Sequence, residues 1–107
     1  LTNKIINLRI FPDEQGKMNK SIIDANGEIL LVSQFTLSGN IQKGNRPSFI
    51  NSQDPEIAKK MIDDVAEIFS DRLTVKQGIF GALMEVSLIN DGPLTMFIES
   101  RDGKIQS

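Results

Sequence analysis

The chain has 107 residues and a formal net charge of −2 at pH 7, with 39% hydrophobic and 24% charged residues. These values are typical of one globular domain with a single core, and the acidic balance provides no overall positive field to attract nucleic acid. Because the sequence holds no Cys and no His, it excludes disulfides, thiolate catalysis, Cys- or His-ligated metal sites and the Ser-His-Asp triad. No apolar run approaches the length of a membrane span, so we expect no membrane association.

The opening segment LTNKIINLRIF predicts the end of a helix that leads into a short strand. Ile5, Ile6 and Leu8 recur at roughly helical spacing, and the apolar run that follows ends at Pro12. Leu1 is not an initiator Met, and a stable helix needs a cap and several turns. We therefore expect that an N-terminal part of the domain is missing from the numbered chain.

A β-hairpin is predicted next, around the dipeptide Asn26-Gly27. This dipeptide is a strong turn signal, and it lies between Ile22-Ile23 and the apolar run at residues 29–32. The second run is apolar at every position, which predicts a central strand covered on both faces.

The longest predicted element is a helix that starts near residue 54. Asp54 is a suitable N-cap, and Pro55 suits the first helical position. Apolar residues then recur every three or four positions and define one face of the helix. They are Ile57, Ala58, Met61, Ile62, Val65, Ala66, Ile68, Phe69 and Leu73.

Two further strands are predicted downstream of this helix, at residues 82–89 and 94–99. Gly78 and Gly81 interrupt the chain before them, and apolar and polar residues alternate in the first of the two. The polar tail, residues 100–107, is expected to fray. Together the elements predict a mixed α/β fold of α+β type in a single domain, residues 1–107.

Two loops carry small basic clusters. Lys43 and Arg46 lie in the stretch 39–53, which contains no acidic residue, and Lys17 and Lys20 flank another Gly-containing loop. Such clusters are more typical of solvated loops than of phosphate sites. They would nevertheless suit a protein that touches only the end of a nucleic acid.

The hexapeptide NDGPLT, residues 90–95, separates the last two predicted strands and holds more than a turn needs. Asn-Asp-Gly already supplies the backbone angles of a tight hairpin, so Pro93 is surplus. Proline fixes its own backbone angle, and the bond before it is where a cis peptide costs only about 0.5–1 kcal/mol. Taken alone the segment fits an ordinary hairpin tip, and both a trans and a cis Gly92-Pro93 bond stay open at this point.

Four short motifs occur in one order along the chain: GKMN at 16–19, SQFTL at 33–37, GNRPSF at 44–49 and NDGPLT at 90–95. Each alone is weak, but together they closely resemble the D-aminoacyl-tRNA deacylase family, formerly called D-tyrosyl-tRNA deacylases. The resemblance covers nearly the whole chain. It departs at the N-terminus, where the family begins with a further strand pair and the first part of the helix, and at Leu94, where Val is more usual.

The resemblance implies a fold, an activity and an assembly. The family fold has a mostly antiparallel, curved and barrel-like sheet with packed helices. The family is a cytoplasmic homodimer that removes D-amino acids, or glycine, from tRNA by hydrolysing the ester to the terminal adenosine, as a chiral proofreading step in translation. Its active site lies at the dimer interface, and it needs no cofactor and no metal.

The resemblance also implies which residues form the site. The SQFTL segment lines the pocket, the cis Gly-Pro step reaches from the partner subunit to check the chiral carbon, and the signature threonine was once proposed as a nucleophile. The candidate catalytic residues are therefore Ser33, Gln34, Phe35, Thr36 and Thr95. The candidate substrate-binding residues are Met18, Arg46, Pro47, Phe49, Asn90, Gly92 and Pro93.

Ester hydrolysis needs an attacking oxygen, a proton acceptor and donors for the developing oxyanion. Because the chain has no His, Thr95 has no conventional base to activate it. We therefore favour attack by water, assisted by the 2′-hydroxyl of the terminal adenosine, with backbone N–H groups around Gln34 to Thr36 as oxyanion donors. Catalysis would then come mainly from orientation and preorganisation.

Structural roles remain open for the same residues. Ser33 and Thr36 suit a strand, Phe35 suits a core, and Arg46 suits a surface loop. Two other classes of protein are also compatible with the motifs. One is a related editing domain of an aminoacyl-tRNA synthetase, and the other is a non-catalytic dimeric module that binds RNA ends.

Overall fold

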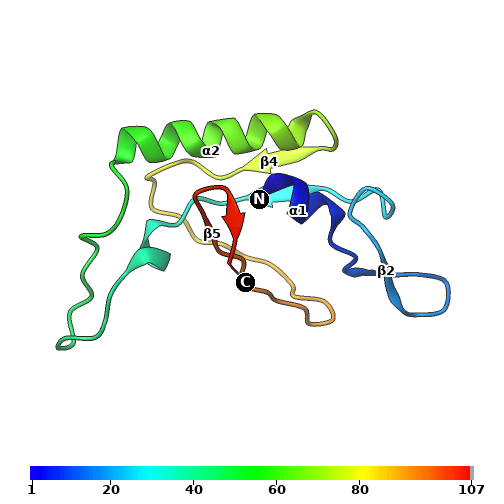
Figure 1. Ribbon diagram of the computed structural model, residues 1–107, viewed down its shortest axis with the longest axis horizontal. Helices are drawn as coiled ribbons and strands as arrows, with labels where there is room; N and C mark the ends of the chain where they lie inside the picture. Colours follow the sequence, from blue (N-terminus) through cyan, green and yellow to red (C-terminus); the bar gives the residue numbers. More distant parts are fainter. Residues whose placement is uncertain (107) are drawn as a thin grey trace. The chain divides into compact units, whose positions relative to one another are not determined.

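The computed structural model describes residues 1–106 and divides the chain into two compact units. One unit combines Leu1–Gly27 with the segment from Leu83 onward, and the other is Glu28–Ala82. Helices and short two-stranded sheets occur together, which confirms the predicted mixed α/β class (Figure 1). Within residues 1–106 no sheet closes on itself, so the barrel-like core is not formed here, and the single domain stays a prediction.

The first unit begins with the predicted helix and strand. Helix α1 (Thr2–Asn7) buries Ile6, and strand β1 (Phe11–Pro12) pairs antiparallel with β2 (Met18–Lys20). Asn7 donates its side-chain amide to the carbonyl of Asn3 at 2.8 Å, one turn back, which helps to hold this short helix. The helix tail and the strand predicted from LTNKIINLRIF are therefore both confirmed.

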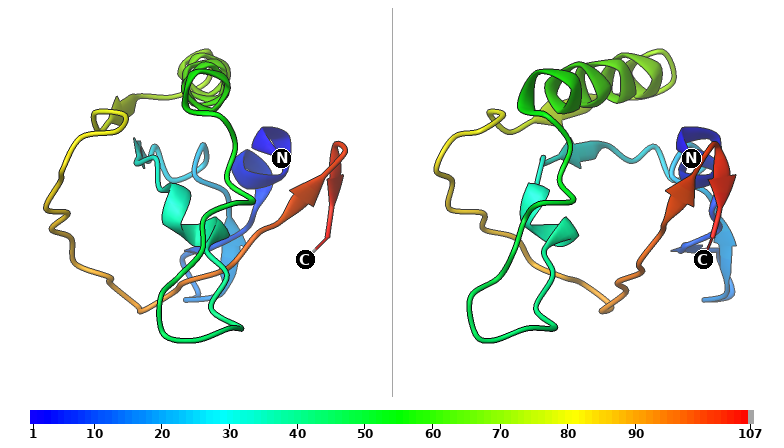
Figure 2. Two further views of the ribbon diagram at one scale, coloured as in Figure 1. Left: turned by 90° about the vertical axis from the view of Figure 1, so that its left-hand side faces the viewer. Right: turned by 60° about the vertical axis from the view of Figure 1, so that its left-hand side comes forward.

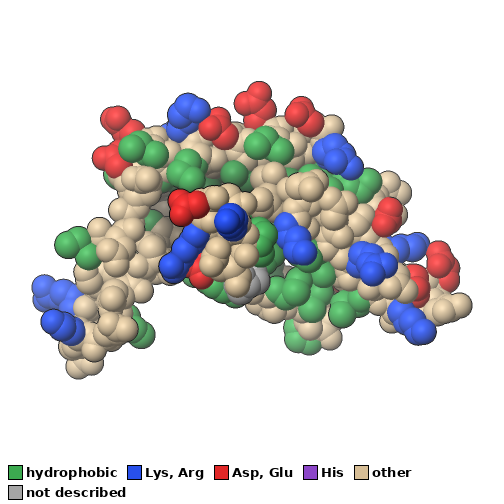
Figure 3. All heavy atoms as spheres, in the orientation of Figure 1, with side chains coloured by type: hydrophobic (Ala, Val, Ile, Leu, Met, Phe, Trp, Pro, Cys, Tyr) green, Lys and Arg blue, Asp and Glu red, His purple; other side chains and the backbone are tan. Residues whose placement is uncertain are grey.

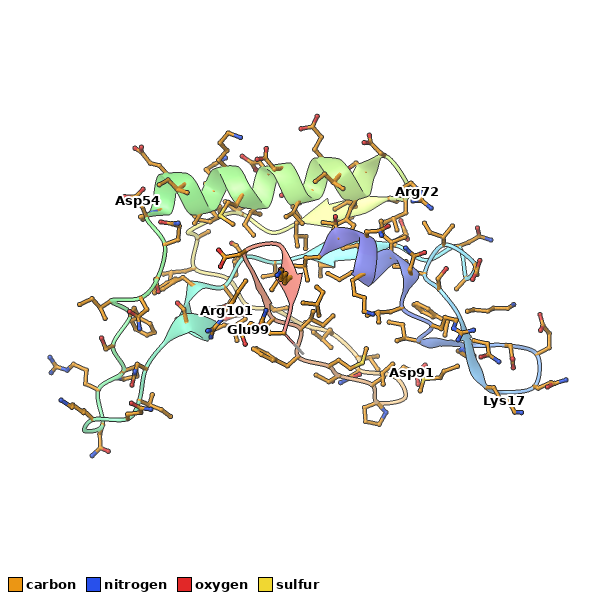
Figure 4. The ribbon with its side chains drawn as sticks, in the orientation of Figure 1. Lys17, Asp54, Arg72, Asp91, Glu99 and Arg101 are labelled. Carbon is orange, nitrogen blue, oxygen red and sulfur yellow. The ribbon has the colours of Figure 1, made fainter. Side chains whose placement is uncertain are left out.

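Residues 100–105 of the C-terminal tail do not fray, contrary to the prediction, and residue 107 of that tail lies outside the described residues. Strands β5 (Ser100–Arg101) and β6 (Lys104–Ile105) form an antiparallel hairpin. The turn uses Asp102 and Gly103 at φ of 52° and 77°, and these left-handed angles are the ones that an Asp-Gly hairpin turn requires. Arg101 also binds the carboxylate of Glu99 at 2.8 Å, and both residues are labelled in Figure 4. The Asp-Gly turn signal, which favours a hairpin, was therefore a better guide than the polar composition, which led to the prediction of fraying.

The second unit is built on a parallel pair of strands joined by a helix. Strand β3 (Ile29–Leu31) pairs with β4 (Val75–Gln77), and α2 (Pro55–Ser70) lies in the connection between them (Figures 1 and 2). Parallel strands need such a long crossover, which is why the helix separates them in sequence. The short 3-10 helix η1 (Phe35–Ser38) follows β3.

Helix α2 begins where the sequence predicts, and its buried residues lie on the predicted apolar face. The carboxylate of Asp54 accepts the N–H of Glu56 at 3.0 Å, and Pro55 is the first helical residue (Figure 4). Ala66 and Phe69 are buried on the apolar face. The helix ends at Ser70, a turn before the last residue of the predicted apolar face. No helix among the described residues combines the length and apolar content that crossing a membrane requires.

Salt bridges cover the exposed face of α2. Lys59 binds Asp63 and Lys60 binds Asp64, each at 2.9 Å and four residues apart. The hydrogen bond to the Asp64 carboxylate and the charge of that group raise the pKa of Lys60. This spacing supports an exposed helix surface.

The hairpin predicted at Asn26-Gly27 is wrong. Residues 22–26 form a turn, in which the N–H of Gly27 donates to the carbonyl of Ile22 at 2.9 Å. Ser21 and Asp24 exchange side-chain and backbone hydrogen bonds at 3.0 and 3.2 Å, as at the start of a helix, so this segment does not extend into a strand. The N–H of Ser21 is also the main cause of the lowered pKa of Asp24.

The predicted two-sided cover of the apolar run at 29–32 is also absent among the described residues. The strand exists as β3, but its only described partner is β4, and Leu30 is 59% exposed. A run of apolar residues indicates that both faces of a strand are suited to burial. It does not show which element covers each face.

The strands predicted at 82–89 and 94–99 do not form in the described part of the chain. Both segments run as irregular backbone, drawn without arrows in Figure 2. A strand is stable only when its N–H and C=O groups find partners, and alternation in sequence does not supply them. Large apolar side chains are consequently exposed here, including Leu83, Leu88, Ile89 and Phe97.

Candidate functional site

Ser33 lies at the edge of a hollow of about 280 Å³ in the second unit. The hollow opens where β3 and β4 end, and the carboxyl ends of parallel strands are a common place for ligand sites. Its volume suits a small group. The lining residues are Leu31, Ser33, Lys59, Ile62, Asp63, Gln77, Gly78, Ile79 and Phe80.

Eight of the nine lining residues were not predicted as site residues. Four of them, residues 77–80, come from the end of β4 and the segment that follows it, which the sequence indicates only as a turn with two glycines. The signal that could have found them is topological. If β3 and β4 are recognised as parallel neighbours, the residues that follow each strand must meet at one edge of the sheet.

The SQFTL segment turns into η1 (Phe35–Ser38) and does not continue β3. Gln34 donates its side-chain amide to the hydroxyl of Thr36, and this bond ties the start of η1 together. The N–H groups of Gln34, Phe35 and Thr36 donate to no other described residue. Three adjacent backbone donors are therefore available to a ligand at this turn.

Phe35 is 62% exposed, so the structure contradicts a core role for it. Its ring contacts Phe49 edge to face, with centroids 5.1 Å apart and planes at 71°. The contact joins SQFTL to GNRPSF. Gly39 lies against the same ring, because a Cβ on Gly39 would be 2.9 Å from a ring carbon of Phe49. Six residues separate the two motifs in the sequence, and the structure brings their aromatic rings into contact.

Arg46 and Pro47 lie in an exposed loop that precedes Phe49. The base of the loop is closed by two backbone hydrogen bonds between Asn40 and Ser48, at 2.8 and 2.9 Å. Basic side chains gather at the tip of this loop, between η1 and α2 (Figure 3). The loop is thus exposed but has a defined base.

The NDGPLT tip lies in the first unit. The Gly92-Pro93 bond is cis, as predicted, and Gly92 adopts φ of +135°. Asn90 spans the tip, because its amide donates to the Thr95 hydroxyl at 2.7 Å and its amide oxygen accepts the N–H of Leu94 at 3.3 Å. Asp91 lies near the end of this tip in Figure 4. Asn90 therefore holds the hydroxyl of Thr95 in place.

Met18 lies in β2, with its side chain exposed, beside a loop that Asp13 organises. The Asp13 carboxylate accepts the side-chain amide of Asn19 and the N–H groups of Lys17 and Gln15, each at 2.9 Å. These bonds, that from Asn19 foremost, lower the pKa of Asp13. Lys17 is labelled on this loop in Figure 4.

The predicted site residues fall into two groups, one in each unit. Residues 33–36 and 46–49 belong to the second unit, whereas Met18 and residues 90–95 belong to the first. Within residues 1–106, no cluster of three or more Asp or Glu side chains could hold a metal ion. Besides the Arg46 guanidinium, the predicted site residues offer hydroxyls, amides and backbone N–H donors, and the hollow adds the paired Lys59 and Asp63 side chains.

A family model described as D-Tyr-tRNA(Tyr) deacylase matches residues 1–99. A D-aminoacyl-tRNA deacylase from Nitratiruptor sp. is 50% identical over 101 residues, which are 94% of this chain and 69% of that protein. The enzyme of the same name from Thermosipho africanus is 54% identical over 102 residues, 94% of this chain and 68% of its own. A solved structure named c-Myc DNA Unwinding Element Binding Protein superposes with a TM-score of 0.85 and 42% identity, over 94% of this chain and 69% of that one.

Proposed function

Since the chain belongs to the D-Tyr-tRNA(Tyr) deacylase family, we propose that it hydrolyses the ester bond of D-aminoacyl-tRNA and of glycyl-tRNA. The products are the free amino acid and tRNA, and the reaction is a chiral proofreading step in translation. The observation that carries this function is 50–54% identity to curated deacylases over 94% of the chain.

The second unit supplies the groups that hold the reacting ester. Ser33 borders the hollow, and the free N–H groups of residues 34–36 are suited to stabilise the oxyanion that forms on the ester carbonyl. The exposed ring of Phe35 offers a surface on which the terminal adenine can stack. Arg46, Pro47 and Phe49 add contacts from the adjacent loop.

Water is the nucleophile in this proposal. Its oxygen bonds to the ester carbonyl carbon, and the bond from that carbon to the ribose oxygen breaks. The ribose oxygen takes the proton that the attacking water loses. The neighbouring 2′-hydroxyl of the terminal adenosine relays that proton. Thr95 positions the substrate, because its hydroxyl is already bound by Asn90 at 2.7 Å and the chain holds no His to activate it.

The NDGPLT tip selects the D configuration. Gly92 has no Cβ, so its backbone can approach the chiral carbon closely enough to leave room for hydrogen only. An L side chain would collide with the main chain, and Met18 borders the site from the same unit. Rejection by fixed backbone excludes the wrong substrate without a dedicated pocket.

The working enzyme is a cytoplasmic homodimer of single-domain subunits, in which the tip of one subunit reaches the site of its partner. The apolar side chains exposed along residues 83–97 support this assembly, since large exposed apolar patches mark interaction surfaces. Pairing along the same segment would complete the curved, barrel-like sheet. No cofactor and no metal are required.

Gly92→Ala is expected to lower kcat/KM for D-Tyr-tRNA about 100-fold, because displacing a catalytic contact by about 1 Å can cost that much. An L residue rarely adopts φ of +135°, and the new Cβ would lie 3.2 Å from the backbone nitrogen of Leu94, so the tip must change shape. Steady-state kinetics measure the loss.

The matched control is Gly103→Ala, which also introduces Cβ at a positive φ in the first unit but meets no atom within 4 Å. It should keep nearly full activity. Equal activity of the two variants would show that the shape of the tip does not matter to the reaction.

The function itself is tested by incubating the protein with D-Tyr-tRNA labelled in the amino acid and following the release of free tyrosine. Continuous turnover is expected. Tight binding without release would instead assign a non-catalytic RNA-end module, and hydrolysis only of a mischarged L-amino acid would assign a synthetase-type editing domain.

A further inference from the structure

The segment between Glu28 and Asp54 contains no acidic residue, although the chain as a whole is negative. Its two cations, Lys43 and Arg46, lie three residues apart in the loop between η1 and α2. This local positive charge contrasts with the net charge of −2 for the whole chain. An anionic partner would therefore be attracted to this loop.

The loop has a fixed base. The N–H of Asn40 donates to the carbonyl of Ser48 at 2.8 Å, and the reverse bond measures 2.9 Å. The side-chain oxygen of Asn40 also accepts the N–H of Gln42 at 2.9 Å, which shapes the turn just before Lys43. A cation held on such a base loses less freedom on binding than one on an unstructured tail.

The cations of this loop have no carboxylate partner within residues 1–106. Outside this loop, Lys20, Lys59 and Lys60 each bind an Asp or Glu side chain at 2.9 or 3.0 Å. Figure 3 shows the basic side chains at the loop tip with no acidic side chain beside them on that face. Their charge is therefore available to an external anion.

A hollow of about 220 Å³ lies along the loop, and it combines one cation with neutral donors. The oxygen of Asn40 already accepts a hydrogen bond, and its side-chain NH₂ adds a donor to the lining. The hydroxyl of Ser48 and the ammonium of Lys43 are further donors in the lining. These are the groups that contact phosphate oxygens in nucleic-acid complexes. The lining is completed by Gln42 and Ile50.

The loop is connected to the segment that we assign to the ester. Phe49, next to Ser48, contacts Phe35 at 5.1 Å. Lys43 follows Thr36 by seven residues, so their Cα atoms are at most about 25 Å apart. A tRNA held by its terminal adenosine therefore brings the phosphates of the nucleotides just before that adenosine within reach of the loop.

We propose that Lys43, with Asn40 and Ser48, binds a phosphodiester of the acceptor end of tRNA, upstream of the terminal adenosine. The proposal rests on the proposed function for its choice of nucleic acid. The contact is independent of sequence, because it is made to the backbone. This contact makes tRNA bind more tightly than a free aminoacyl-adenosine, which has no such phosphodiester.

The direct test is binding of a fluorescein-labelled acceptor-stem minihelix ending in CCA, measured by anisotropy across a salt series. Lys43→Gln should weaken binding about three- to fivefold at low salt and reduce the slope of log K against log salt by about 0.7–0.9, the loss of one phosphate contact. The matched control is Lys60→Gln, which removes the same charge from an exposed position in the same unit. Equal binding by the two variants would overturn the proposal.

Kinetics separate this proposal from the proposed function. Lys43→Gln should lower kcat/KM for D-Tyr-tRNA by the same three- to fivefold and leave hydrolysis of D-tyrosyl-adenosine unchanged. An equal loss on both substrates would place Lys43 at the terminal nucleotide and contradict a phosphate role. If the wild-type protein hydrolysed neither substrate, the proposed function would fail, and the minihelix measurement would still decide the role of Lys43.

Discussion

A D-aminoacyl-tRNA whose terminal ribose lacks the 2′-hydroxyl is expected to be hydrolysed about 10²- to 10⁴-fold more slowly, whereas Thr95→Ala keeps most of the activity. Proton transfer by a positioned group typically accelerates a reaction by this factor, and we assign that role to the 2′-hydroxyl of the substrate. The Thr95 hydroxyl contacts the side-chain amide of Asn90, which cannot act as a base. Single-turnover rates with tRNA ending in adenosine or 2′-deoxyadenosine measure the effect.

Two controls make this comparison decisive. The spontaneous hydrolysis rate of each ester must be subtracted, because the 2′-hydroxyl alters the intrinsic reactivity of the ester. Thr95→Val keeps the branched shape and removes the hydroxyl, so it separates packing from chemistry. If Thr95 were the nucleophile, its removal would cost several orders of magnitude, and an acyl group would be found on Thr95 by mass spectrometry.

Phe69→Ala is expected to lower the free energy of unfolding by about 3–5 kcal/mol, the usual cost of removing a buried aromatic ring. Phe69 is 2% exposed and is the largest of the three buried apolar residues in the described chain. Because small domains are stable by only about 5–15 kcal/mol, the loss should be visible as a lower urea midpoint and a lower Tm.

Ile57→Ala is the matched control, since it removes a large apolar side chain from the same helix at a position that is 52% exposed. Its cost should stay below about 1 kcal/mol. Similar losses at both positions would mean that Ile57 is covered in the working assembly and that burial in the single chain does not identify the core.

Local signals in the sequence predicted local structure well. Asp54 and Pro55 identified the start of α2, and the spacing of its apolar residues identified the face that buries Phe69. A cap and a helical period act within a few residues, so no distant segment is needed to interpret them. The same local logic explains why Asp102-Gly103 makes a hairpin that composition alone did not predict.

Strand pairing was predicted poorly because it depends on partners that the local sequence does not name. Residues 82–89 alternate as a strand should, yet no described segment pairs with them. Asn26-Gly27 carries a hairpin signal, but the hydrogen bonds between Ser21 and Asp24 favour a helical turn. The residues that line the hollow with Ser33 were missed for the same reason, since β4 had not been paired with β3.

The motifs, in contrast, contain residues that the structure brings into contact, although the sequence did not predict the individual contacts. Phe35 and Phe49 belong to separate motifs and contact each other, and Asn90 and Thr95 close one tip. The roles of these residues in the reaction stay predictions, because they depend on how the substrate binds.

The central claim is stereoselective hydrolysis, and the most direct measurement is the ratio of rates on D-Tyr-tRNA and L-Tyr-tRNA under identical conditions. Both esters have the same leaving group and nearly the same intrinsic reactivity, so the ratio isolates the selection made by the protein. We expect D-Tyr-tRNA to be hydrolysed at least about 100-fold faster, the discrimination that a strong steric clash can provide. Equal rates on the two substrates would contradict the account.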